Sequence, residues 1–122
     1  MANEMTPLCG FGMGEGGNGA PVMSTLRYSQ IESPASGSTV VVADNGNDVV
    51  LMLNPAGSLS MVTIALPQSG SNLQILRIIS MKDIVSTQFN GGTVLNAPTE
   101  MLANQSVSIQ RINNSTNTWV TI

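Results

Sequence analysis

The residue types that carry most protein chemistry are scarce in this chain of 122 residues. It contains no histidine, the commonest general base and metal ligand, and a single cysteine, Cys9, so an intrachain disulfide is excluded. Paired carboxylates could hydrolyse a glycosidic bond. The candidates Asp44, Asp48, Asp83 and Glu100 all lie in or beside predicted turns, and nothing in the sequence links any two of them. We therefore expect no catalytic residues and a protein that is not an enzyme.

Two short motifs have the letters of ligand-binding loops. Residues 12–17 (GMGEGG) have the glycine spacing of a dinucleotide-binding loop, which requires a strand before it and a helix after it. Neither is predicted there. Residues 44–48 (DNGND) place oxygen ligands at alternate positions, as a calcium loop does, but they are few and lack the bidentate glutamate. An extended arm and a hairpin turn are the simpler interpretations, so we expect no cofactor and no metal.

The charge of the chain excludes two classes of partner. Charged residues make up only 9% of the sequence and the net charge is −3. The basic residues are scattered, so they form no basic patch for nucleic acid or for a membrane surface: Arg27, Arg77, Lys82 and Arg111. No apolar run is long enough to span a bilayer, and the N-terminus lacks the pattern of a signal peptide. We expect synthesis in a cytoplasm, with any external role reached through assembly and release.

Residues 1–37 have the composition of an extended arm. Their centre, residues 10–19, is mostly glycine, which loses the most backbone entropy on ordering and does not hold a helix or strand alone. A pure linker would not need the apolar residues that are spaced along the arm. We predict that the arm binds a partner or a larger body through these residues: Met5, Leu8, Phe11, Met13, Val22, Met23 and Leu26.

Residues 38–122 have the pattern of a β domain. Seven or eight short runs of β-branched and aliphatic residues alternate with turn signals such as Asn45-Gly46-Asn47, and one weak helical pattern covers residues 99–104. This spacing predicts an all-β fold, a small antiparallel β-sandwich or barrel of jelly-roll type. The expected strands cover residues 39–44, 48–53, 59–66, 73–80, 84–89, 93–96, 106–112 and 118–122.

The expected strand 73–80 is apolar on both faces, which is typical of a strand that lies between two layers or at a subunit interface. From this strand we predict the oligomer interface: Leu73, Ile75, Leu76 and Ile78. Trp119, in the closing strand, is predicted to lie in the core or at an interface. Few other aromatic side chains could stack on a sugar, so a glycan is the weaker hypothesis for a ligand.

The C-terminal half resembles small β domains of tailed-bacteriophage virion proteins, including capsid decoration proteins, head fibres and tail-fibre modules. The likeness covers roughly residues 39–122 and consists of turn residues and spacing. It implies a homotrimer, a place in the virion, and the major capsid protein or another virion protein as partner. The segments that carry it are Leu66-Pro67, Gly70, residues 73–78, Asn90-Gly91-Gly92-Thr93, residues 106–109 and Thr118-Trp119-Val120-Thr121-Ile122.

Three functional hypotheses follow. The first is a non-enzymatic virion structural protein, a capsid decoration, cement or head-fibre protein whose arm binds the capsid surface. The second is a tail-fibre or adhesin module that binds a host receptor or glycan. Deletion of residues 1–37 discriminates between them, because a decoration protein loses capsid binding whereas an adhesin keeps binding cells. A hydrolase is the third hypothesis, and two carboxylates facing each other in a cleft would support it.

Overall fold

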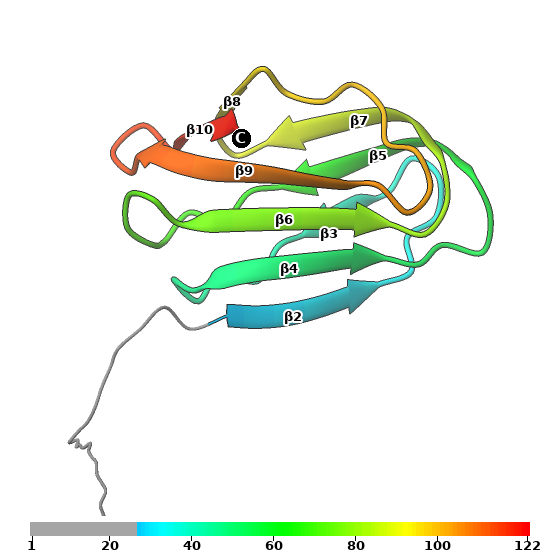
Figure 1. Cartoon of the computed structure of the whole chain (residues 1–122), viewed down its shortest axis with the longest axis horizontal. Helices are drawn as coiled ribbons and strands as arrows, with labels where there is room; N and C mark the ends of the chain where they lie inside the picture. Colours follow the sequence, from blue (N-terminus) through cyan, green and yellow to red (C-terminus); the bar gives the residue numbers. More distant parts are fainter. Residues whose placement is uncertain (1–26) are drawn as a thin grey trace, which may run out of the picture.

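The computed structural model describes residues 27–122 (Figure 1), which form an all-β domain without a helix. The prediction of an all-β fold is confirmed, and residues 99–104, with their weak helical pattern, form an irregular connection. The strands are β2 (Arg27–Glu32), β3 (Thr39–Val41), β4 (Asp48–Leu53), β5 (Leu59–Ala65), β6 (Ile75–Ser80), β7 (Ile84–Asn90), β8 (Thr93–Leu95), β9 (Ser106–Asn113) and β10 (Thr118–Thr121).

The strands form two sheets that face each other as layers (Figure 1). The larger sheet has six strands in the order β2-β4-β6-β9-β10-β8, and the smaller has three in the order β3-β5-β7. From β2 to β7 the chain alternates between the two sheets, and each strand pairs in parallel with the next strand of its own sheet. Such an alternation winds the chain into three stacked coils, a solenoid-like arrangement.

This arrangement differs from the predicted antiparallel sandwich or barrel. Antiparallel pairing is confined to β9, which lies between β6 and β10, among the strands of residues 27–122. The turn at residues 45–47 follows β3 and precedes β4, two strands in different sheets, so it is a crossing between layers and not the expected hairpin. Turn residues and alternating apolar positions are the same in both architectures, and they do not reveal which strands become neighbours.

The core fills the space between the two sheets. Alternate residues of a strand point to opposite faces, and the inward residues of successive coils stack on one another. Val49 lies beside Leu76, and Leu76 lies beside Ile109 of β9. The apolar residues of this core are almost fully buried: Val40, Val42, Val49, Leu51, Leu53, Leu59, Val62, Ile64, Leu66, Leu76, Ile78, Ile84, Met101, Ile109 and Trp119.

The first coil closes one end of the core with polar side chains. Gln30 of β2 lies in register with Leu51 of β4, where the next coil has an apolar residue. Its Nε2 donates a hydrogen bond to Val41 O at 2.8 Å, and its Oε1 accepts one from Ala43 N at 2.8 Å. Gln30 therefore bridges from β2 to β3 and its following turn, and gives the stack a polar end, which the terminal repeat of a solenoid needs for solubility.

The paired length of β2 places residues 27–37 with the β domain and not with the arm. β2 is in register with β4 from Arg27 to Glu32, and Gly37 N donates to Met61 O at 2.8 Å. The apolar residues predicted to bind a partner, Met5 to Leu26, lie outside the described residues. The first described strand, β2, begins at Arg27.

Candidate interaction surfaces

Three of the four carboxylates that sequence reasoning considered for catalysis accept hydrogen bonds from backbone N–H groups. Asp44 Oδ1 accepts from Ser69 N at 2.7 Å, Asp48 Oδ1 from Ile75 N at 3.0 Å, and Asp83 Oδ1 from Ala103 N at 2.8 Å. The bonds of Asp44 and Asp83 each tie one connection of the domain to another, and the bond of Asp48 ties the start of β4 to the start of β6. Among residues 27–122, no three or more Asp, Glu, Cys or His side chains gather as a metal site would require.

The end of the solenoid formed by β9 and β10 contains a buried cation. Arg111 of β9 is 0% exposed, and its guanidinium carbon lies 4.7 Å from the centre of the Trp119 ring. Its Nη2 donates to Pro67 O at 2.8 Å and its Nη1 to Gly70 O at 3.2 Å. Burial lowers the pKa of Arg111, and the charge of Asp44 partly opposes that shift. The guanidinium thus joins β9 and β10 to the connection between β5 and β6.

Trp119 belongs to this same cluster and not to a ligand site. Its ring is fully buried, and its Nε1 donates to Asn117 Oδ1 at 2.9 Å. Asn117 in turn donates from Nδ2 to Pro67 O and to Gly91 O, at 3.1 and 2.9 Å. Trp119 was predicted to lie in the core or at an interface, and the structure places it in the core. A stacking platform for sugar is therefore absent at this residue.

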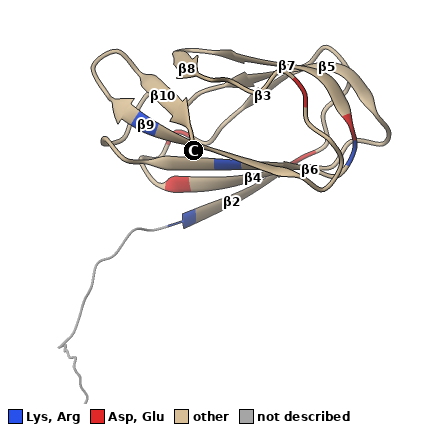
Figure 2. Cartoon of the chain, turned by 45° about the horizontal axis from the view of Figure 1, so that its top comes forward, with Lys and Arg blue, Asp and Glu red and all other residues tan. Residues whose placement is uncertain are grey.

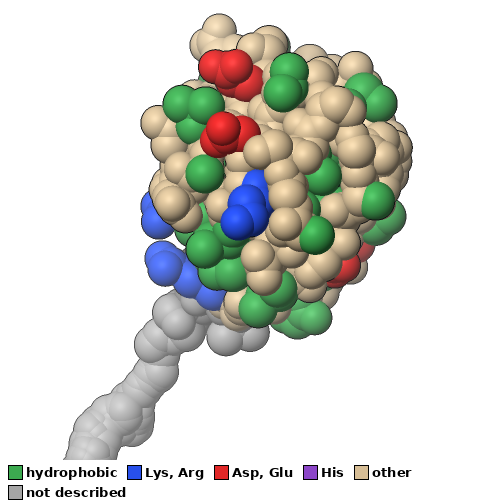
Figure 3. Space-filling model, turned by 90° about the vertical axis from the view of Figure 1, so that its right-hand side faces the viewer, with side chains coloured by type: hydrophobic (Ala, Val, Ile, Leu, Met, Phe, Trp, Pro, Cys, Tyr) green, Lys and Arg blue, Asp and Glu red, His purple; other side chains and the backbone are tan. Residues whose placement is uncertain are grey.

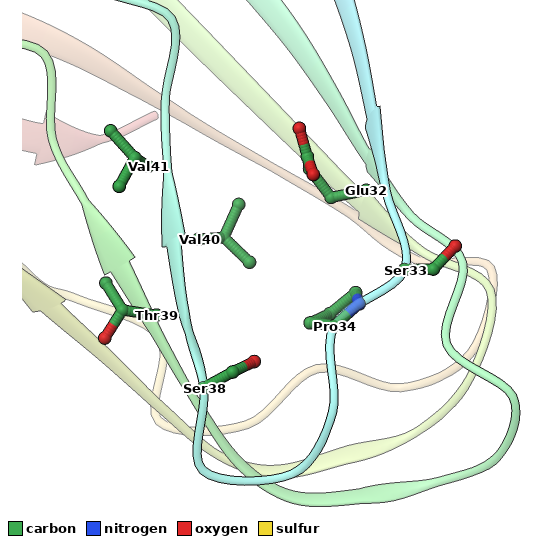
Figure 4. Close-up of a pocket in the computed structure, with 7 residues that line it drawn as sticks. All are labelled: Glu32, Ser33, Pro34, Ser38, Thr39, Val40 and Val41. Atoms are coloured by element: carbon green, nitrogen blue, oxygen red, sulfur yellow. The ribbon is translucent and has the colours of Figure 1, made fainter.

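A hollow of about 320 Å³ opens at the first coil, between the end of β2 and β3 (Figure 4). Glu32, Pro34 and Val40 surround it, together with the serines and threonine of the connecting segment. Glu32 Oε2 accepts a hydrogen bond from Gln30 Nε2 at 3.1 Å. The hollow lies beside the first coil, where β2 and β3 are the edge strands of their sheets among the described residues. Edge strands present backbone groups to which a further chain can pair.

The outward face of the six-stranded sheet is weakly charged and partly apolar. Figure 2 marks the positions of Lys, Arg, Asp and Glu along the ribbon, and few of them lie on the strands. Arg77 of β6 is exposed, and its Nε donates to Ser108 Oγ at 3.2 Å. Apolar residues lie to either side of it along β6, since Ile75 and Ile79 share its face and are half-buried. This face therefore presents aliphatic side chains that are only partly covered in the single chain.

Four aliphatic residues gather at one end of the six-stranded sheet. We call them the outer cluster: Leu73, Ile75, Ile112 and Val120. They surround Gln110 of β9. Ile75 and Val120 lie directly opposite Gln110 on the two neighbouring strands, and Gln110 Nε2 donates to Leu73 O at 3.2 Å. Ile112 is the next residue of β9 on that face, because Ile109 and Arg111 point into the core.

The opposite end of the molecule differs from the outer cluster. Figure 3 views the end at which β2, β4 and β6 finish, and hydrophobic side chains are scattered there among polar and charged ones. Exposed apolar residues that occur singly are normal for a folded protein. That end therefore contributes no comparable cluster.

The predicted interface residues divide between the surface and the core. Leu73 is 67% exposed and Ile75 is half-buried on the outward face, so both present surface to a partner. Leu76 and Ile78 are 1% and 0% exposed because they point between the two sheets, and they offer no surface to a second subunit. Sequence reasoning did not select Ile112 and Val120, although the alternation of their strands contained the signal.

The comparisons with known proteins found no matching family model, no matching curated protein and no matching solved structure. Among residues 27–122, the structure has no helix long and apolar enough to cross a membrane.

Proposed function

We propose that this chain is a non-enzymatic structural protein of a bacteriophage virion, a decoration or head-fibre protein. In this proposal residues 1–26 attach the chain to the major capsid protein or another virion protein, and the β domain projects from that attachment. The protein is made in the host cytoplasm and incorporated during assembly. The resemblance of residues 39–122 to virion β domains motivates the proposal.

The observation that carries the proposal is that the two ends of the coil stack differ. The first described strand, β2, begins at Arg27 and forms one edge of the six-stranded sheet. The other edge, at β8, belongs to the end where β9 reverses the direction of the chain (Figure 1). A domain that is attached through its first coil and ends in the antiparallel strands β9 and β10 suits a protein that projects from a surface.

The low charge of the domain supports the same proposal. A chain with 9% charged residues gains little solubility from charge repulsion and tolerates close neighbours. Many copies on one surface must lie near one another, and strongly charged domains would repel in that setting. The composition therefore suits a crowded assembly.

The experiment measures co-sedimentation of the full-length chain with empty capsids of the virus that encodes it. The test variant replaces two apolar residues of the arm, Leu8→Asp with Phe11→Asp, because burial of these residues is the proposed source of affinity. The control, Glu4→Gln with Glu15→Gln, changes polar residues of the same segment. We expect the wild type and the control to pellet with capsids and the apolar variant to stay in the supernatant.

Two results would oppose this proposal. If the wild type does not pellet with capsids, the attachment to a shell is wrong. If the apolar variant binds as tightly as the wild type, the arm is not the anchor. Circular dichroism of all three proteins controls for folding, since the substitutions lie outside the β domain.

The second candidate is a tail-fibre or adhesin module that binds a host receptor or glycan. One observation favours it: Tyr28, in the first coil, is 44% exposed and lies on β2, the strand whose end borders the hollow with Glu32. Tyr28→Ala reduces binding to host cells if this candidate holds, whereas capsid co-sedimentation is unaffected. Capsid binding without cell binding eliminates it.

A further inference from the structure

Two asparagines of the described domain are followed directly by glycine. Asn45-Gly46 lies in the turn between β3 and β4, and Asn90-Gly91 lies where β7 turns into β8. The side-chain amide of an asparagine is open to attack by the backbone nitrogen of the next residue. Glycine has no side chain to shield that nitrogen, and its backbone is the most mobile. The geometry of each turn then determines whether the reaction takes place in the folded protein.

The reaction consumes only water. A solvent base removes the proton of the glycine nitrogen, which attacks Cγ of the asparagine and forms a C–N bond, so that a cyclic imide closes. The bond between Cγ and the amide nitrogen breaks, and that nitrogen takes up a proton and leaves as ammonia. Water then opens the imide. Opening at the side-chain carbonyl leaves aspartate, and opening at the backbone carbonyl leaves isoaspartate, in which the chain runs through the former side chain.

The turn at Asn45 holds the reacting atoms together. Asn45 is exposed, and its Oδ1 accepts a hydrogen bond from Asn47 N at 3.0 Å. The ring of atoms that this bond closes contains both Cγ of Asn45 and N of Gly46, so the electrophile and the nucleophile lie on the same side of the turn. The same N–H polarises the amide carbonyl and stabilises the negative charge that grows on Oδ1 during the attack.

The nitrogen of Gly46 is accessible to a solvent base. Gly46 is exposed and has a φ of 79°, which glycine adopts without strain. Beyond the adjacent residues, no atom lies within 4 Å of the position that a Cβ would take there. Among the hydrogen bonds of residues 27–122, none has Gly46 N as its donor. The nitrogen can therefore lose its proton and move towards Cγ without breaking a contact.

The flanks of this turn are fixed while its apex is not. Before the apex, Asp44 Oδ1 accepts from Ser69 N at 2.7 Å, and after it Asp48 Oδ1 accepts from Ile75 N at 3.0 Å. Both bonds anchor the turn to the connection between β5 and β6. Closure of the imide consequently deforms only the exposed apex and leaves the pairing of the strands intact.

The turn at Asn90 is held on both sides of the reacting bond. Asn90 O accepts from Leu66 N at 3.0 Å, and Gly91 O accepts from Gln68 Nε2 at 2.8 Å and from Asn117 Nδ2 at 2.9 Å. Closure of an imide there requires the backbone to rotate about Asn90, and that rotation breaks these bonds. The same dipeptide therefore resists the reaction at the second position.

We propose that Asn45 is a site of spontaneous deamidation in the folded protein, with Gly46 N as the nucleophile, and that Asn90 stays intact. This inference is independent of the attachment to a virion. Each conversion adds one negative charge to a chain whose net charge is −3, and places it between Asp44 and Asp48. The turn between β3 and β4 thus becomes more acidic as the protein ages.

The experiment incubates the full-length chain at about pH 8 and about 37 °C, because loss of the nitrogen's proton is base-catalysed. Trypsin then cleaves after the basic residues, so Asn45 and Asn90 fall in separate peptides, residues 28–77 and 83–111. A third pair, Asn18-Gly19, lies outside the described residues and falls in the peptide of residues 1–27. Mass spectrometry with fragmentation locates the exchange of the amide for a carboxylate, and labelling by an isoaspartate methyltransferase detects isoaspartate.

We expect Asn45 of the folded protein to lose its amide at least about tenfold faster than Asn90, and the two rates to become similar in urea. Gly46→Ala slows the reaction at Asn45, because a methyl group shields the nitrogen, and Asn45→Gln abolishes it without a change of charge. Circular dichroism shows whether both variants are folded. Equal rates at Asn45 and Asn90 in the folded protein overturn the proposal, as does an Asn45 that reacts only in urea. An unchanged rate in folded Gly46→Ala would exclude Gly46 N as the nucleophile.

Discussion

Removal of the Arg111 side chain tests how much this residue stabilises the end of the solenoid formed by β9 and β10. Arg111→Ala deletes two hydrogen bonds, to Pro67 O and Gly70 O, and the contact with the Trp119 ring. A hydrogen bond from a charged donor contributes about 1.5–3 kcal/mol, and the vacated space adds the cost of a cavity. The desolvation of the cation, which already lowers the pKa of Arg111, is relieved and offsets part of this loss.

The balance of these effects is a destabilisation of about 3 kcal/mol. For a domain of about 100 residues, that corresponds to a fall in melting temperature of about 12–24 °C. Thermal unfolding followed by circular dichroism measures it, and Trp119 fluorescence reports on the same cluster. The control is Arg77→Ala, which removes an exposed guanidinium with one bond to Ser108 and costs less than about 0.5 kcal/mol. Equal effects of the two substitutions would refute the structural role of Arg111.

Three further predictions concern single residues of the domain. Gly92→Ala destabilises by more than about 1 kcal/mol, because a Cβ there would clash with Asn117 O, whereas Gly57→Ala is neutral because nothing lies within 4 Å of its Cβ; urea unfolding compares the two. Gln30→Leu costs about 1–2 kcal/mol in the same assay, since two backbone groups lose their partner, and no loss would show that the first coil needs no polar bridge. Leu73→Gly stabilises the domain by about 1 kcal/mol, because the φ of Leu73 is 74°, in the left-handed region that strains a leucine, and a lower melting temperature would contradict the strain.

Local sequence patterns were sufficient to predict the strands but not their partners. Most of the expected runs became strands within a few residues, because β-branched content and turn residues act locally. The pairing of β4 with β6, in contrast, joins residues 27 positions apart, such as Val49 and Leu76. The interval from Arg27 to its partner Asp48 is 21 positions, so the coils have unequal lengths and no visible repeat. Only tertiary packing determines that neighbouring strands run parallel.

The sequence predicted only part of the exposed apolar surface around residues 73–80, and the reason is physical. A strand that is apolar on both faces, such as residues 73–80, indicates contacts on both sides but not which side faces the core. Leu76 and Ile78 therefore could not be separated from Ile75 by pattern alone. The burial of Arg111 was available in principle from the sequence, because Arg111 continues the alternation of the apolar residues Val107 and Ile109. The positive charge of Arg111, however, favours an exposed position over a buried one.

The strain at Leu73 could not be anticipated from sequence. Leucine carries no preference for the left-handed region, and the β-bulge at residues 73 and 74 exists only because the backbone of Arg111 in β9 accepts and donates hydrogen bonds opposite them. The information lies in a contact between segments almost forty residues apart. Features of this kind, which contradict a local preference, are expected at sites of binding.

The most direct test of the proposed virion role is a binding isotherm of the full-length chain on empty capsids, read as copies bound per capsid. We predict saturation at a fixed number of copies, and no specific binding by the variant Leu8→Asp with Phe11→Asp. Binding that never saturates, or that is unchanged in this variant, would contradict the attachment of the β domain to a shell through its N-terminal arm.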